Sequence, residues 1–225
     1  MKTKWNSKLT TLLTGLIFGG CASFEPGLRY QELMRARVPT VKEMSEGVDV
    51  SVEEFATASK SRFAFDADLA SYGVLALLVR LENNGAENYH VHQNDIRAMM
   101  TGQSLPFLSP IEAANKAVTS EYVGKALAWT VATGPFFILF WPATIAGSSS
   151  HTQSVNKRIQ EYFEALSFNG SLLKPNQVAS GFLYFRLPDG VKKLENLSLE
   201  LQISEERTGK RPNFKLSLPP LDVSG

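Results

Sequence analysis

The sequence is poor in residues that ligate metals or form disulfides, with one cysteine and three histidines among 225 residues. A single cysteine excludes a disulfide framework and a cysteine-rich zinc site. An excess of charge is also missing, because 23 lysines and arginines are balanced by 22 aspartates and glutamates. No basic patch with interleaved aromatic residues is present, so we expect no binding to nucleic acid. The 44% share of apolar residues supplies a buried core and excludes a chain that is disordered throughout.

Short catalytic motifs are missing as well. The sequence has no G-x-S-x-G, no Walker loop, no G-x-G-x-x-G and no H-E-x-x-H. We therefore expect neither an enzyme nor a bound cofactor. A hydrolase whose catalytic group assembles from distant residues stays open as an alternative, and a deep polar pocket would be its sign.

The N-terminus has the pattern of an export signal. Three lysines within the first eight residues precede an uncharged stretch of ten (residues 9–18), which is too short to span a bilayer. Gly19, Gly20 and then Cys21 follow. This order resembles the bacterial lipoprotein signal, in which the cysteine at the cleavage site is lipidated and becomes the new N-terminus.

The lipoprotein resemblance implies a membrane-bound envelope protein. Residues 1–20 would be removed, and Cys21 would carry the acyl chains, palmitate among them, that attach the protein to a membrane. Ala22 in place of aspartate after the cysteine favours the outer membrane, on its periplasmic face. An ordinary secretory signal with a chance cysteine is the alternative. Residues 21–46, with Pro26 and Pro39, are typical of a tether.

Alternation of apolar and polar residues predicts several strands. In residues 197–203 leucine or isoleucine occupies every second position, and residues 74–81 form an apolar run typical of a central strand. Further strands are expected over residues 48–53, 89–100, 182–185 and 214–218. Strands of this length, separated by turns, predict a mainly β fold, an antiparallel β-sandwich.

Two helices interrupt the strand pattern. Ser109, Pro110 and Glu112 form a capping box that predicts a helix from residue 110. Residues 155, 159, 162, 163 and 166 are apolar and fall on one face of a second helix, with Asn169-Gly170 as its end.

A second resemblance covers roughly residues 47–218. The motifs F-x-x-D-L (residues 65–69), G-V (73–74) and V-R-L-E-N (79–83) look like the opening of an Ig-like domain found in bacterial exported proteins and lipoproteins of unknown function. The stretch 173–185 looks like a later strand–turn–strand of such domains. The resemblance implies an Ig-like sandwich and no activity.

These patterns together predict the domain organisation. The expected parts are a signal peptide (1–20), a lipidated tether (21–46), an Ig-like β-sandwich (47–218) with a helical insertion at about 110–166, and a C-terminal tail (219–225).

The insertion contains 22 residues without a charge, 126–147, with an aromatic cluster formed by Phe136, Phe137, Phe140 and Trp141. Two full membrane spans need about 40 residues, and strands on both sides of the insertion that pair in one sandwich exclude a single span. We expect short apolar helices or a hairpin. Three roles stay open: packing into the core, contact with a membrane surface, and contact with an envelope protein partner.

His90, Val91 and His92 form the only suggestive metal-binding pattern. Residues two apart on a strand share a face, so both imidazoles can reach one metal ion. Solvated strand histidines are the alternative interpretation. The function we expect is a non-enzymatic, lipid-anchored binding or assembly module, and the alternative is a periplasmic metal-binding protein that uses His90 and His92.

Overall fold

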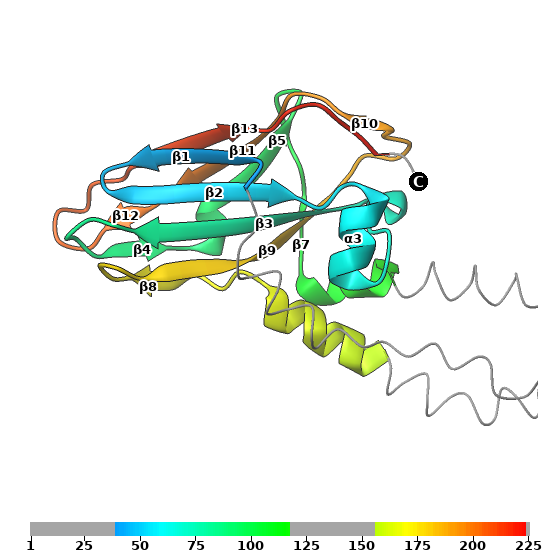
Figure 1. Ribbon diagram of the computed structural model, residues 1–225, viewed down its shortest axis with the longest axis horizontal. Helices are drawn as coiled ribbons and strands as arrows, with labels where there is room; N and C mark the ends of the chain where they lie inside the picture. The colour runs from blue at the N-terminus through cyan, green and yellow to red at the C-terminus, as the bar shows by residue number, and fades with distance from the viewer. Residues whose placement is uncertain (1–38, 118–155, 224–225) are drawn as a thin grey trace, which may run out of the picture.

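The computed structural model describes residues 39–117 and 156–223. Within them the chain is mainly β, with antiparallel pairing between the neighbouring strands of every sheet. A five-stranded sheet has the order β1-β2-β3-β9-β7, and a four-stranded sheet has the order β13-β11-β5-β6. Two smaller sheets, β12-β4-β8 and β10-β14, lie at the ends of these layers (Figure 1).

The strands of the five-stranded sheet are β1 (Val41–Ser45), β2 (Val48–Glu54), β3 (Val74–Asn83), β9 (Val178–Arg186) and β7 (Phe107–Leu108). Those of the four-stranded sheet are β13 (Asn213–Ser217), β11 (Leu197–Gln202), β5 (Ile96–Met100) and β6 (Gln103–Ser104). The remaining strands are β12 (Ser204–Glu205), β4 (Tyr89–Val91), β8 (Ser171–Leu173), β10 (Lys193–Leu194) and β14 (Leu221–Asp222). The helices are α3 (Ala58–Phe65), the 3₁₀ turns η2 (Ala70–Tyr72) and η3 (Gln93–Asp95), and the helical stretches 110–117 and 156–166.

Strands from both halves of the chain pair with each other. β3 pairs with β9 from Val74 opposite Arg186 to Glu82 opposite Val178. β5 pairs in the same way with β11 in the other sheet. The segment between residues 117 and 156 therefore interrupts the sequence without dividing the sheets.

One apolar core fills the space between the two main sheets. The inward residues of β2 are Val48, Val50 and Val52, and they belong to the same buried cluster as Leu199 and Leu201 of β11. Alternate residues of a strand point to opposite faces, so the period of two in the sequence produces this one-sided burial. Leu199 and Leu201 are both 0% exposed, which confirms the prediction that they belong to the core.

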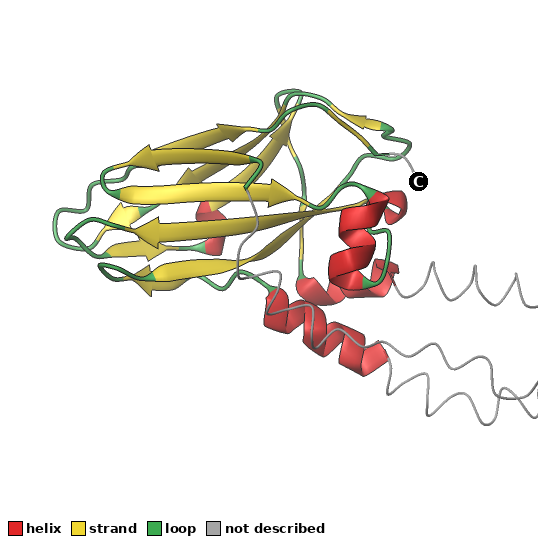
Figure 2. Cartoon of the chain, in the orientation of Figure 1, coloured by secondary structure: helices red, strands yellow, loops and turns green. Residues whose placement is uncertain are grey.

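A second core lies on the other face of the five-stranded sheet, under the helices (Figure 2). Phe182 and Tyr184 of β9 point to this face, while Leu183 and Phe185 between and after them point into the first core. Phe65 of α3 packs on Phe182, with ring centroids 4.9 Å apart. Both faces of β3 and β9 are thus buried, which explains the unbroken apolar runs in their sequences.

The β-sheet domain extends further at both ends than the sequence pattern indicated. β1 lies inside the stretch expected as a tether (21–46), because its mixed sequence VKEMS pairs residue by residue with β2. β14 lies inside the expected tail (219–225) and pairs with β10.

Three local features also differ from expectation. α3 was not predicted, because only Ser61, Ala64 and Phe65 of its eight residues are buried and its apolar pattern is weak. The second helix ends at residue 166, before Asn169-Gly170, because Ser167 forms a bridge to Phe182. Asp49 and Glu53 of β2 are buried, although they alternate with the inward valines, and they form ion pairs with Lys42 and Lys60.

Truncation of Leu201 tests the assignment of the first core. The Leu201→Ala variant should lose about 2–5 kcal/mol of unfolding free energy, because it leaves a cavity among fully buried neighbours. Chemical denaturation monitored by circular dichroism measures this loss. The control is Val178→Ala, an exposed position on β9, which should change stability by less than about 0.5 kcal/mol. A similarly small change for Leu201→Ala would contradict the core assignment.

Candidate functional site

The helical layer determines where the chain leaves and re-enters the described structure. The helix 110–117 begins at the predicted capping box: the Glu112 backbone N–H donates to Ser109 Oγ over 3.2 Å, and the Ser109 N–H donates to Glu112 Oε2 over 2.8 Å. These hydrogen bonds from Ser109 hold the pKa of the Glu112 carboxyl below its usual range. The capping box predicted from the sequence is confirmed.

The helix 156–166 is fixed to the sheet by aromatic packing and by one close backbone approach. Phe163 packs on Phe65 with ring centroids 5.1 Å apart, and Tyr162 Oη donates to the Ala64 carbonyl over 2.8 Å. Just after this helix, the Phe168 N–H donates to the Phe182 carbonyl over 2.8 Å. A Cβ on Gly181 would lie 2.5 Å from the Phe168 backbone, so only glycine permits this approach.

The two helices hold the ends of the segment 118–155 next to each other. Gln160 Nε2 donates to Asn115 Oδ1 over 2.8 Å, and Ala117 and Ile159 belong to the same buried cluster. Asn115 is two residues before the last described residue of the first stretch, and Gln160 is four residues after the first described residue of the second. The chain therefore leaves and returns at neighbouring points on one side of the domain.

The N-terminal segment enters close to the same helical layer. Thr40 Oγ1 donates to the Glu54 carboxylate, and Lys60 Nζ of α3 lies 2.6 Å from Glu54 Oε1 and 3.4 Å from Glu53 Oε1. Glu54 is only 2% exposed, and a buried carboxylate of this kind needs such partners. Residues 39–40 are thus tied to α3, which itself packs on the helix 156–166.

The predicted lipidation and contact residues are outside the described structure. Cys21 precedes residue 39, and Phe136, Phe137, Phe140 and Trp141 belong to the segment 118–155. The apolar hairpin predicted over 126–147 lies outside the described residues as well. The structure does give the positions of residue 39, which follows the N-terminal segment, and of residues 117 and 156, which flank the segment 118–155.

The predicted histidine pair lies at the opposite end of the sheets. His90 of β4 and His92 have parallel rings with centroids 6.2 Å apart. His90 Nε2 is 3.7 Å from Glu206 Oε1. Across residues 39–117 and 156–223, no group of three His, Cys, Asp or Glu side chains is close enough to hold a metal ion. The pair therefore shares a face, as predicted, without a third ligand from this part of the chain.

An ion-pair network joins the loops around these histidines. Arg207 forms two hydrogen bonds to Glu87, from Nε to Oε2 over 3.2 Å and from Nη2 to Oε1 over 2.9 Å. Lys210 Nζ lies 2.5 Å from Glu46 Oε1, and Tyr89 Oη donates to the Glu46 carbonyl over 2.9 Å. Burial raises the pKa of the Tyr89 hydroxyl. We call this end, with the loops that carry Glu46, Glu87 and Arg207, the distal tip.

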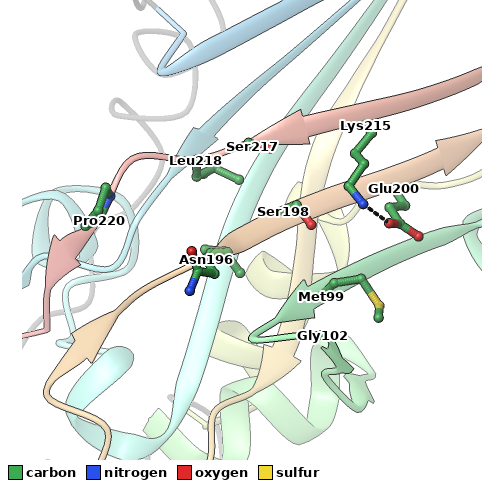
Figure 3. Close-up of a pocket in the computed structure, with 10 residues that line it drawn as sticks. Met99, Gly102, Asn196, Ser198, Glu200, Lys215, Ser217, Leu218 and Pro220 are labelled. Carbon is green, nitrogen blue, oxygen red and sulfur yellow. Dashed lines mark ion pairs between the residues drawn. The ribbon is translucent and has the colours of Figure 1, made fainter.

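A hollow of about 360 Å³ lies on the outer face of the four-stranded sheet (Figure 3). It was not predicted, because its residues come from three strands and the adjoining turns and share no local pattern in the sequence. Ser198 of β11 lies between Met99 of β5 and Ser217 of β13, which are its partners in register. The Lys215–Glu200 ion pair, with Nζ and Oε1 3.0 Å apart, borders one end. Asn196, Leu218 and Pro220 line the rest.

Comparisons with known proteins find only solved structures that align at low identity and low TM-score. No protein-family profile matches the chain, and no curated protein matches it. A provisionally assigned lipoprotein, ycdA of Bacillus subtilis, aligns at 13% identity and a TM-score of 0.37, over 80% of this chain and 39% of its own length. The yjhA protein of Bacillus subtilis aligns at 8% identity and a TM-score of 0.40. The alignment covers 79% of this chain and 96% of yjhA. A functionally unknown protein of Listeria monocytogenes aligns at 11% identity and a TM-score of 0.35. The alignment covers 79% of this chain and 80% of the Listeria protein.

Among the described helices, none has the length and apolar character needed to cross a bilayer.

The Arg207–Glu87 pair predicts a pH effect at the distal tip. The hydrogen bonds from Arg207 lower the pKa of Glu87, so the ionised pair stabilises the tip above the ordinary glutamate pKa. This stabilisation is lost as the pH falls through the lowered value. In Arg207→Gln the Glu87 pKa should rise to the ordinary range, as followed by carboxyl-carbon NMR. The exposed neighbour Arg211→Gln should leave it unchanged. An unchanged Glu87 pKa in Arg207→Gln would contradict the pairing.

Proposed function

We propose that this protein is a lipid-anchored module of the bacterial envelope, held through Cys21 at the periplasmic face of the outer membrane, with a non-enzymatic role in binding or assembly. One observation carries the proposal. The ends of the segment 118–155 lie together on the helical layer, joined by the Gln160–Asn115 hydrogen bond, and residues 39–40 are tied to the same layer through Glu54 and Lys60. The chain that leads to Cys21 and the apolar segment therefore start from one end of the domain.

The sheet pairing restricts what the apolar residues 126–147 can do. A single membrane span would place residues 117 and 156 on opposite sides of the bilayer, which the pairing of β3 with β9 does not allow. Two spans need about 40 residues, and the apolar stretch 126–147 has 22. We propose that the aromatic cluster of Phe136, Phe137, Phe140 and Trp141 contacts the leaflet next to the anchor. Amphipathic or apolar segments add to membrane binding when a single lipid anchor is weak.

We also propose that the two main sheets form an Ig-like sandwich. The antiparallel pairing and the shared core between the layers support this proposal. The helical stretches 110–117 and 156–166 then flank an insertion into that sandwich.

Replacement of the cysteine tests the anchor. Cys21→Ser should leave residues 1–20 attached and remove the lipid, because the lipoprotein peptidase requires a lipidated cysteine at the cleavage site. Mass spectrometry of the N-terminal peptide from membrane and soluble fractions measures both effects. Cys21→Ser protein that is cleaved at the same bond and retained normally would contradict the anchor. Ala22→Ser is the control and should be processed and lipidated as the parent.

Removal of the apolar segment tests the orientation. A variant in which a short Gly/Ser linker replaces residues 126–147 should fold, because the helices on both sides dock through their own buried residues. In flotation assays with proteins that begin at residue 22, and so have neither the signal segment nor the lipid, its binding to vesicles should fall several-fold below that of the protein that keeps residues 126–147. Loss of cooperative unfolding in the linker variant would show that the segment is part of the core. Unchanged vesicle binding would contradict leaflet contact.

A further inference from the structure

The hollow on the outer face of the four-stranded sheet exists because small side chains stand among long ones. Ser198 and Ser217 are opposite each other in register on β11 and β13. Two residues further along, the same strands carry Glu200 and Lys215, and β5 places Met99 beside Ser198. The longer side chains surround the two serines and leave a hollow of about 360 Å³. This volume is within the usual range of about 300–1,000 Å³ for small-molecule sites.

Several polar groups in the hollow have no protein partner. The side chains of Asn196, Ser198 and Ser217 make no hydrogen bond with any residue in the part of the chain that the structure describes. Ser198 is 8% exposed and lines the hollow, so a ligand seated there can reach its hydroxyl. A ligand that hydrogen-bonds to these groups replaces their hydrogen bonds to water, which leaves a modest net gain for each bond.

Two hydrogen bonds from backbone N–H groups and one turn fix the positions of the residues that line the hollow. The Leu218 N–H donates to the Leu197 carbonyl over 2.8 Å, which positions the chain that follows β13. The Lys215 N–H donates to Glu43 Oε2 over 2.9 Å, which fastens the edge of β13 to β1. Asn196 has a left-handed backbone with a φ of 53°, and this turn directs the chain into β11. A site that is formed before binding loses less conformational entropy when the ligand arrives.

The charges that border the hollow compensate each other. Lys215 and Glu200 form an ion pair with each other at 3.0 Å, as Figure 3 shows, so this wall has no net charge. Arg97, which lies opposite Glu200 on β5, is the nearest further charge by register, and it does not line the hollow. A ligand with net charge would therefore gain little here over a neutral one. Met99, Leu218 and Pro220 add an apolar surface beside the hydroxyl and amide groups.

We propose that this hollow binds a neutral saccharide of one or two rings. Hydroxyl-rich rings offer donors and acceptors that match two serine hydroxyls and one primary amide, each of which can both donate and accept. The apolar ring faces of a sugar match Met99, Leu218 and Pro220. The site lies on the sheet opposite the one that carries the helices, so the proposal is independent of the membrane anchor and of the segment 118–155 (Figure 1).

Saturation-transfer NMR on the full-length lipidated protein tests the proposal, in a detergent without a sugar head group. The probes are two neutral disaccharides, maltose and N,N′-diacetylchitobiose. At least one should give transfer signals with a dissociation constant of about 1 mM, a value typical of a few net hydrogen bonds. A disaccharide of galacturonic acid tests the role of charge and should bind no more tightly. Tenfold tighter binding of this acid would overturn the neutral assignment, and no signal from either neutral probe at 20-fold higher concentration, about 20 mM, would overturn the site.

Two variants locate the binding. Ser198→Val fills the hollow and removes its central hydroxyl, while valine suits a strand, so it should lower affinity at least tenfold without unfolding the protein. Asn196→Gly removes the amide and keeps the left-handed backbone, and should lower affinity about fivefold. Asn176→Gly is the matched control, because Asn176 also has a positive φ of 60° and lies far from the hollow in sequence, in the turn between β8 and β9. Equal affinity in Ser198→Val and the parent protein would place the sugar elsewhere and overturn the proposal, whereas the anchor and the orientation would be unaffected.

Discussion

The pairing of β3 with β9 is the constraint on which the rest of the structure depends. These strands come from opposite sides of the segment 118–155 and stay in register from Val74–Arg186 to Glu82–Val178. Their pairing forces the intervening chain to return to the place it left. It also places Phe182 and Tyr184 on the face that the helices cover. The position of the helical layer, and of the two chain ends that emerge from it, follows from this one ladder.

Burial on both faces makes that ladder strong and gives the domain two cores. The inner core joins the two main sheets, and the outer core joins β3, β7 and β9 to α3 and the helical stretches 110–117 and 156–166. The outer core is rich in aromatic rings, with Phe65 in contact with Phe163, Phe182 and Tyr184 at centroid distances of 5.1, 4.9 and 6.0 Å. Aromatic contacts of this geometry add to the stability gained from apolar burial. The helices are thus fixed parts of the domain, and they hold residues 117 and 156, between which the segment 118–155 lies.

The sequence predicted the elements whose patterns are local. The alternation of residues 197–203, the apolar run 74–81 and the capping box at Ser109 and Glu112 each depend on near neighbours, and each is found in the structure. β1 was missed because its mixed sequence has no clear apolar alternation, although its partner β2 follows after two residues. α3 was missed because the residues that cover it are distant in sequence. The strand VKEMS is recognisable only beside β2, and α3 buries few residues until Phe163 and Phe182 cover Phe65.

Among the candidate sites, too, only those with a local sequence pattern could be predicted. The shared face of His90 and His92 follows from a spacing of two, whereas the hollow around Ser198 needs three strands in register and has no local signal. Its serines and asparagine are residue types that any solvent-facing strand or turn carries. The tie between Thr40, Glu54 and Lys60 likewise joins three elements, so the sequence could not show that the N-terminal segment enters beside the helices.

The orientation of the domain on the membrane can be measured directly with one fluorophore at either of two positions. Arg158 lies on the helical layer and Arg211 on the loop before β13, and both are exposed. Cys21 is the only cysteine, and the proposed lipidation would occupy its sulfur, so a cysteine introduced at either position would be the single reactive thiol. In vesicles that contain quencher lipids, a dye at position 158 should be quenched more strongly than one at position 211. Equal quenching, or stronger quenching at 211, would contradict a domain whose helical end faces the bilayer.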